Sequence, residues 1–126
     1  MSLRVLTVAM VAIGGIALSA TAMAEQSGVF KTRLNPGSKN IGPCSNVDGS
    51  LGREQTVTVA GGKASVNSAG GLKGNLKPIG PDKYEAANFG MGGVLLTVTA
   101  DLSVTPPLMT VTERQFGCRW EGVLKK

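Results

Sequence analysis

Between Gln55 and Leu124 the sequence consists of short stretches in which apolar and polar residues alternate, and glycine-rich turns separate these stretches at intervals of roughly ten residues. Alternation with a period of two places every second side chain on one face, as in a half-buried strand. No window keeps a helical period over three turns, and the many glycines and β-branched residues oppose helices. The pattern predicts an all-β fold, a small antiparallel meander that closes into a barrel, with a β-sandwich as the alternative.

About seven strands are expected, joined mostly by short hairpins such as the one at Gly61-Gly62. The turn at residues 78–82 and a flexible break at residues 89–93 interrupt the pattern. Five large side chains are expected to line the barrel and to fill it. They are Tyr84, Leu96, Val98, Met109 and Trp120. A pocket for a small apolar ligand inside the barrel is a further hypothesis. The expected strands are residues 55–60, 63–67, 72–77, 83–88, 94–100, 108–113 and 117–124.

The stretch from Gly117 to Leu124 holds one of the two cysteines and the only tryptophan. Alternation places Cys118 and Trp120 on the same inward face, so Trp120 is expected to anchor the core beside a disulfide. A disulfide between Cys44 and Cys118 is the simplest pairing in an exported chain, and its long loop predicts a contribution of roughly 4 kcal/mol. The alternative, two free thiols in redox chemistry, lacks a C-x-x-C motif.

Residues 1–24 have the features of a secretory signal peptide. Arg4 gives a short positive region, residues 5–18 are almost continuously apolar, and residues 22–24 form an A-x-A cleavage site. The apolar run is shorter than the roughly 20 residues that span a bilayer, so we expect no membrane span after cleavage. These features predict an exported bacterial protein, either periplasmic or secreted.

After the cleavage site, residues 25–52 are expected to form an irregular N-terminal arm, because turn signals dominate and apolar residues are few. Within the arm, Val29-Phe30 is expected to pack as a short edge strand. Residues 53–126 form the predicted β-meander domain, and Cys44 would hold the arm against it so that both pack as one unit. The arm is also the most basic local segment, which we interpret as a solvated surface; its cations are Lys31, Arg33 and Lys39.

The residue types that are missing restrict the available chemistry. The chain has no histidine, which removes the commonest general base and the commonest transition-metal ligand. A Ser-His-Asp or Cys-His arrangement is therefore impossible. The eight acidic residues are scattered along the chain, and we interpret them as surface charges rather than a catalytic pair. The sequence predicts no catalytic residue, no metal and no cofactor.

Three lysines on neighbouring predicted strands, Lys63, Lys73 and Lys77, are expected to face outward. If these strands pair in sequence order, the lysines form a basic surface that could contact an anionic glycan or a lipid head group. No aromatic residues interleave with them to stack on bases, so we do not expect a nucleic-acid partner. A structural alternative is that lysines on exposed strands prevent edge-to-edge aggregation.

These features together favour an exported, non-enzymatic β-domain that binds an envelope polymer or has a structural role in the cell envelope. The alternative is an inhibitor of an exported enzyme such as a protease. A disulfide-linked β scaffold suits the presentation of a rigid loop, for which residues 112–117 and 89–93 are the candidates. The net charge of +5 argues against a strongly basic target, because like charges slow association.

Overall fold

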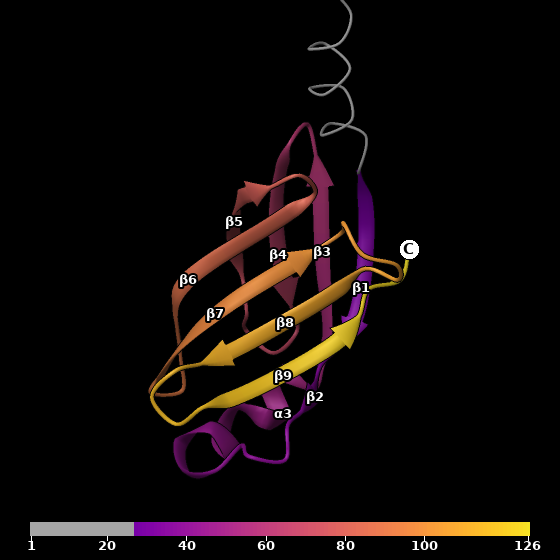
Figure 1. Cartoon of the computed structure of the whole chain (residues 1–126). Coiled ribbons are helices and arrows are strands. Elements are labelled where there is room, and N and C mark those ends of the chain that lie inside the picture. Colours follow the sequence, from indigo (N-terminus) through magenta and orange to yellow (C-terminus); the bar gives the residue numbers. More distant parts are fainter. Residues whose placement is uncertain (1–26) are drawn as a thin grey trace, which may run out of the picture.

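In the computed structural model, which describes residues 27–126, the chain forms one antiparallel sheet of nine strands that curls into a nearly closed barrel (Figure 1). This confirms the predicted all-β, barrel-like meander, and the alternative sandwich is not found. The signal peptide predicted at residues 1–24 lies outside the described residues. Among the helices of residues 27–126, none is long and apolar enough to cross a membrane.

The order of the strands around the barrel is β1-β3-β4-β5-β6-β7-β8-β9-β2. From β3 to β9, strands that are consecutive in the sequence are therefore also neighbours in the sheet. Two short helices connect β2 to β3. The elements are β1 (Gly28–Arg33), β2 (Asn35–Pro36), the 3-10 helix η1 (Gly42–Val47), α3 (Asp48–Leu51), β3 (Glu54–Ala60), β4 (Lys63–Ser68), β5 (Gly74–Gly80), β6 (Lys83–Met91), β7 (Val94–Asp101), β8 (Leu108–Glu113) and β9 (Cys118–Val123).

The first hairpin forms as the sequence predicts. Gly61 and Gly62 both have positive φ angles, 60° and 77°, as a two-residue hairpin turn with the twist of a sheet requires. The turn sets the register of β3 and β4, in which Val57 faces Val66. Both valines are buried, so the apolar face of this hairpin points into the barrel.

Two strands are longer than the sequence predicts. β5 continues through Pro78 to Gly80, and β6 continues to Met91, across the positions of the expected turn and flexible break. Both strands contain a register shift, which lets each one continue past an irregular position. In β6 the shift includes Asn88, whose φ angle is 58°. The true turn of the β6–β7 hairpin is limited to Gly92-Gly93.

The N-terminal arm is more regular than expected. Its first part is the six-residue strand β1, which pairs with β3 along its full length and buries Phe30. Its last part forms η1 and α3, which lie at one end of the barrel (Figure 1). The sequence signal for β1 is weak, because the apolar Val29 faces outward with Lys31 and Arg33 and only Phe30 and Leu34 mark the inward face.

The barrel closes because the chain changes partner after Leu34. β1 pairs with β3, whereas β2 pairs with β9. Beyond β9, the backbone of Lys31 exchanges two hydrogen bonds with that of Lys125, at 2.8 and 3.0 Å. This contact and the pairing of Asn35 with Glu121 share one register, so β1, Leu34 and β2 run as one edge alongside β9. We call this junction the seam.

Gly122 determines how closely the two edges of the seam approach. A Cβ atom at this position would lie 2.6 Å from the carbonyl oxygen of Arg33 and would also overlap the hydroxyl of Thr32. Both are closer than side-chain carbons approach in folded proteins, so only glycine fits here without a shift of the backbone. The seam therefore depends on a residue that makes no side-chain contact of its own.

We expect Gly122→Ala to lower the free energy of unfolding by about 1–3 kcal/mol, because overpacking would widen the seam. Chemical denaturation monitored by tryptophan fluorescence would measure the change. Gly49→Ala is the matched control, because a Cβ atom there meets no atom within 4 Å. Equal stability of the two variants would contradict the proposed role of Gly122.

Helices η1 and α3 form a plug at the end of the barrel, which we define as residues 42–51. The disulfide between Cys44 and Cys118 joins the plug to β9 and confirms the predicted pairing. Beside it, the indole N–H of Trp120 donates a 2.7 Å hydrogen bond to the carboxylate of Asp48. The side chains of Val47 and Leu51 are buried against the barrel, so covalent, polar and apolar contacts all hold the plug in place.

The barrel interior is filled by one cluster of buried side chains. The five residues predicted to line it, Tyr84, Leu96, Val98, Met109 and Trp120, are all at most 2% exposed. Gln55 also lies inside, where its amide donates hydrogen bonds to the carbonyl oxygens of Leu51 and Arg53. The side chains of the interior therefore pack against one another and form the core of the protein.

The barrel is expected to lose stability in acid through Asp101. Burial by itself would raise the pKa of this carboxyl, but hydrogen bonds from Ser103 and the ammonium of Lys83, 3.6 Å away, lower it. A pKa that is lower in the folded than in the unfolded chain stabilises the fold above the unfolded value of about 3.9. That contribution disappears as the pH falls through the folded pKa.

Asp101→Asn tests this expectation, because the amide keeps the shape of the carboxyl without its charge. Denaturant unfolding should show a stability deficit of the variant at neutral pH that is smaller at an acidic pH below the folded pKa of the wild-type carboxyl. A deficit of the same size at both pH values would show that shape, not charge, is what matters at this position.

Candidate functional site

The largest hollow along the seam lies between the outward side chains of β1 and those at the end of β9. It has a volume of about 590 Å³, and four of its nine lining residues carry a positive charge. The cations are Lys31 and Arg33 from β1, together with Lys125 and Lys126 beyond β9. Glu54 is the single carboxylate among the lining residues, so their side chains sum to three positive charges.

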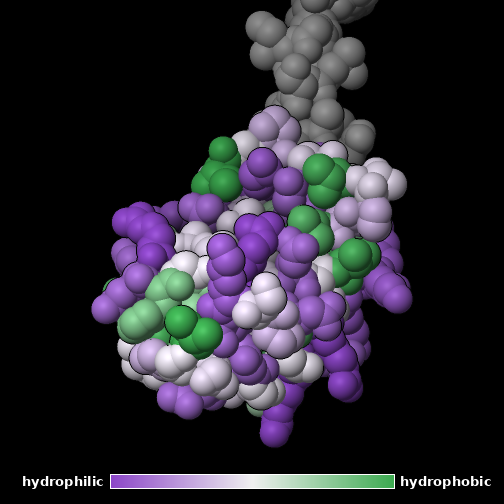
Figure 2. Space-filling model, turned by 60° about the horizontal axis from the view of Figure 1, so that its bottom comes forward, coloured by the Kyte–Doolittle hydropathy of each residue, from purple (hydrophilic) through white to green (hydrophobic). Residues whose placement is uncertain are grey.

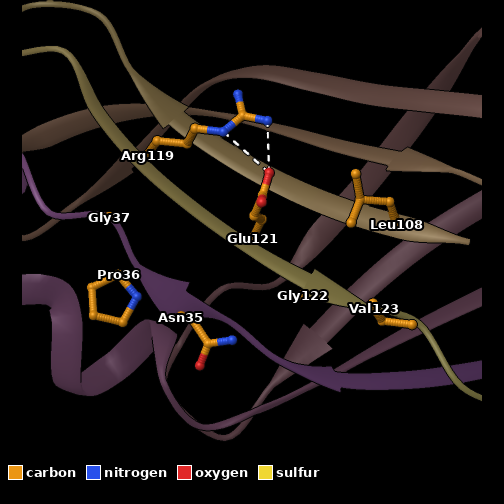
Figure 3. A pocket seen from close by; sticks show the side chains of 8 residues that line it. All are labelled: Asn35, Pro36, Gly37, Leu108, Arg119, Glu121, Gly122 and Val123. Carbon is orange, nitrogen blue, oxygen red and sulfur yellow. Dashed lines mark hydrogen bonds and ion pairs between the residues drawn. The ribbon is translucent and has the colours of Figure 1, made fainter.

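A second hollow, of about 300 Å³, continues from the first, since both share Asn35, Gly122 and Val123. Figure 3 shows it between β2 and β9, with Leu108 of β8 on its far side. The guanidinium of Arg119 folds onto the carboxylate of Glu121, with a closest N–O distance of 2.7 Å. We define the two hollows together as the seam groove.

The charges within the seam groove are unevenly neutralised. Arg119 is paired with Glu121, and Lys31 lies 3.7 Å from Glu54. Both pairs are about half exposed, so each is screened by solvent and holds its partner weakly. Arg33 and Lys125 have no ion pair within 4.0 Å among the described residues. The first hollow of the groove, which these two residues line, therefore keeps a positive electrostatic potential.

Lys126 also contributes a positive charge to the first hollow. Its ammonium lies 5.6 Å from the centre of the Phe30 ring, a cation–π distance. Phe30 is 3% exposed, so the lysine side chain lies over the end of the core. The contact holds one cation of the groove near β1.

The three lysines predicted to contact an anionic surface lie elsewhere. Lys63, Lys73 and Lys77 are all exposed on β4, before β5 and on β5. Ala64 faces Leu76, and when this register is extended by one residue, Lys63 stands opposite Lys77. Lys73 lies four residues before Lys77, or roughly 13 Å along an extended chain. The structure therefore brings Lys63 and Lys77 together. Lys77 also faces Glu85 on the neighbouring strand β6.

The ionisable groups of the interior are poorly placed for catalysis. Tyr84 is 2% exposed, and burial, reinforced by the negative charge of Asp82, raises the pKa of its hydroxyl. Such a phenol stays protonated at neutral pH and does not reach the surface. These properties do not suit Tyr84 to a catalytic role.

Glu113 is a buried acid that the sequence pattern did not indicate. Its carboxylate accepts hydrogen bonds of 2.8 Å from the backbone N–H groups of Gln115 and Phe116. One carboxylate oxygen also lies 3.5 Å from the sulfur of Cys44. Glu113 and the two cysteines are close enough to share a metal ion, but both sulfurs are joined in the disulfide and offer no thiolate. The carboxylate instead fixes the β8–β9 loop.

Hydrophobic residues on the plug end of the barrel are dispersed. Figure 2 brings this end forward and shows green residues singly or in small groups among purple ones. The large exposed apolar side chains of the molecule come from different segments, and they include Ile41, Leu95 and Phe116. The face in Figure 2 therefore lacks a broad apolar patch of the kind that marks an interaction site.

The sequence pattern does not identify the seam groove. Lys31 and Arg33 stand out as basic residues, but within the sequence they fit a solvated arm. Only the closure of the barrel brings them beside Lys125 and Lys126, from the other end of the described chain. The charge alternation in Lys31-Thr32-Arg33, at strand spacing, is the one local signal for two cations on the same face.

The fold and the groove together define a small, disulfide-linked, nearly closed antiparallel β-barrel with a filled interior and a basic groove on its outside. In comparisons with models of protein families, with curated proteins and with solved structures, nothing matches this chain. Its own residues are therefore the basis for a proposed function.

Proposed function

We propose that the protein is an exported, non-enzymatic binding domain of the cell envelope, periplasmic or secreted, and that it holds an anionic envelope polymer in the seam groove. The observation that carries this proposal is the set of four cations around one hollow that contains a single carboxylate. The disulfide fits an exported protein, because disulfides form and persist in oxidising compartments.

Two further features support binding rather than catalysis. The chain has no histidine. The buried groups that could titrate, Tyr84 and Glu113, lie inside the core or are occupied by backbone donors. The filled interior also argues against a small apolar ligand inside the barrel, since the predicted lining residues contact each other. The outer surface is therefore the better place for a ligand.

Two variants of equal charge test the proposed function. The first neutralises the groove through Lys31→Gln, Arg33→Gln, Lys125→Gln and Lys126→Gln. The second neutralises four exposed lysines outside it, through Lys39→Gln, Lys63→Gln, Lys73→Gln and Lys77→Gln. Sedimentation with purified anionic envelope polymers, at physiological ionic strength, would measure binding of both variants and of the wild type.

The groove variant should lose most of the binding, and the second variant should keep most of it. The reason is that physiological salt screens the interactions of an exposed charge beyond about 8 Å. Equal losses would show that only the net charge matters. Retention of binding by the groove variant alone would move the site to Lys63, Lys73 and Lys77. Turnover of a substrate by the purified protein would contradict a non-enzymatic role.

A second candidate function, inhibition of an exported enzyme, is favoured by one observation. The β8–β9 loop is held by the Glu113 carboxylate and by the disulfide at Cys118, so Arg114 and Phe116 are exposed on a fixed backbone. Residues 114–117 form a tight turn, however, which differs from the extended chain that a protease cleft accepts. A panel of exported proteases assayed at micromolar protein would show inhibition if this function holds.

A further inference from the structure

The cations of the seam groove come from both edges of the seam. Lys31 and Arg33 belong to β1, and Lys125 and Lys126 follow β9. Lys31 and Lys125 lie directly opposite each other, since their backbones exchange both hydrogen bonds of a ladder pair. Like charges in directly opposite positions destabilise a sheet. Lys31 lies 3.7 Å from Glu54, but this pair is half exposed and weak, so a repulsion remains that a negative group between the two edges would remove.

The seam is also sparsely paired. It has three ladder pairs, the same number as the β4–β5 and β5–β6 junctions, and they are interrupted between Lys31 and Asn35. β1 and β3 share six ladder pairs, as do β8 and β9. Along the seam the ladder pairs are Lys31 with Lys125, Asn35 with Glu121 and Pro36 with Trp120. No ladder pair between Arg33 and Val123 is found among the described residues, although the shared register places them opposite. Local opening is favoured where hydrogen bonds are few and exposed.

The shape and the lining of the groove indicate the chemistry of its ligand. Lys31 and Arg33 are two residues apart on one strand, so their side chains leave the sheet roughly 6.8 Å apart. The groove then continues past Thr32 and Asn35 into the second hollow, where Arg119 is already paired with Glu121. The groove therefore suits an elongated ligand whose negative groups lie in the first hollow. The hydroxyl and amide of these two residues can hydrogen-bond to sugar hydroxyls.

The lining disfavours the other common polyanions. None of the described residues that line the groove is aromatic, so it offers no ring on which nucleic-acid bases could stack. Its exposed apolar residues are few, and it is concave, which does not suit the plane of a lipid surface. A carboxylated or phosphorylated glycan meets the charge, the length and the polar lining at once.

Resting on the proposed function, we propose that the seam groove binds an anionic glycan whose negative groups bridge the cations of β1 to those beyond β9, and that this binding holds the seam closed. The ligand then acts as a clamp on the barrel. Because the open seam separates the two sets of cations, it binds the glycan more weakly than the closed seam, and binding shifts the population to the closed state.

Oligogalacturonate is a suitable probe, because it carries one carboxylate per sugar. Amide hydrogen exchange would report opening of the seam at Lys31 and Lys125, whose N–H groups bond across it. At a ligand concentration ten times the Kd, exchange at these two amides should slow about tenfold if the open seam does not bind. Neutral dextran of the same length should have no effect, and binding of the anionic probe should weaken with added salt.

Lys125→Glu tests whether the opposed lysines both destabilise the seam and hold the glycan. The variant replaces the opposed lysines with an opposite-charge pair, so exchange at Lys31 should be slower without ligand, and the affinity for the probe should fall by about tenfold or more. Lys125→Gln, which removes the repulsion without adding an acid, should show intermediate exchange and weaker binding. Lys63→Glu makes the same charge change on β4, away from the seam, and should leave both properties near wild type.

The outcomes distinguish the clamp from the proposed function. Binding of the probe without a change in exchange at Lys31 and Lys125 would overturn the clamp and leave the proposed function standing. Loss of binding in Lys63→Glu but not in Lys125→Glu would overturn the seam as the site. Tighter binding of a single-stranded DNA of equal charge would overturn the choice of a glycan. Failure of every anionic polymer to bind the wild-type protein would overturn both.

Discussion

Trp120→Ala is expected to lower the free energy of unfolding by about 3–5 kcal/mol, the range for removal of a large aromatic side chain from a core. Trp120 is fully buried and belongs to the single core cluster of the barrel. Its indole N–H also donates to Asp48, so the substitution removes both a large packing unit and a polar link to the plug. Urea unfolding followed by far-UV circular dichroism would measure the loss, because the variant has no tryptophan fluorescence.

Two further variants separate packing from the hydrogen bond. Trp120→Phe keeps an aromatic ring but not the N–H donor, and should lose about 1–3 kcal/mol. Phe116→Ala removes a large ring that is 39% exposed and should change stability little, within about 0.5–1 kcal/mol. If Trp120→Ala were as stable as Phe116→Ala, the tryptophan would not anchor the core, whatever its burial.

Removal of the disulfide is expected to have the second large effect. The bond joins residues separated by 74 positions, and the chain-entropy model gives about 4 kcal/mol for a loop of this size. The double variant Cys44→Ser and Cys118→Ser should therefore be less stable than the wild type by this amount. Its plug keeps the Asp48–Trp120 hydrogen bond and the burial of Leu51, which favour the same fold without the covalent link.

Denaturation of the wild type with and without a dithiol reductant gives an independent measure of the same effect. The reduced wild type and the double serine variant should agree within about 1 kcal/mol, because both lack the same constraint on the unfolded chain. A reduced protein as stable as the oxidised one would show that the plug is held by its non-covalent contacts alone.

Much of the barrel could be predicted because strand patterning is local. A strand exposes alternate side chains to opposite faces whatever its partners are, so Leu96, Val98 and Met109 were correctly assigned to the interior from their neighbours in the sequence. The hairpin at Gly61-Gly62 was also predictable, since two adjacent glycines allow the positive φ angles of the turn. The disulfide followed from there being only two cysteines.

Other features were hidden because their cause is not local. β6 passes beyond Asn88 through a register shift, which depends on the neighbouring strand as much as on β6 itself. Glu113 looks like one more surface acid in the sequence, yet its position beside the disulfide and the β8–β9 turn buries it. The alternation that buries Met109 also places Glu113 on the inward face, but its hydrogen bonds to Gln115 and Phe116 exist only because the β8–β9 turn folds back toward it.

The sequence by itself determined the strands, their inward faces, the pairing of Cys44 with Cys118 and the need for Trp120 to find a core, because each follows from backbone geometry or from composition. The tertiary structure alone decided the seam. Barrel closure places Lys31 opposite Lys125 and lets Gly122 meet the backbone of Arg33. The physical reason is that strand pairing between the two ends of a chain depends on the summed twist and register of all the strands between them, which no local pattern encodes.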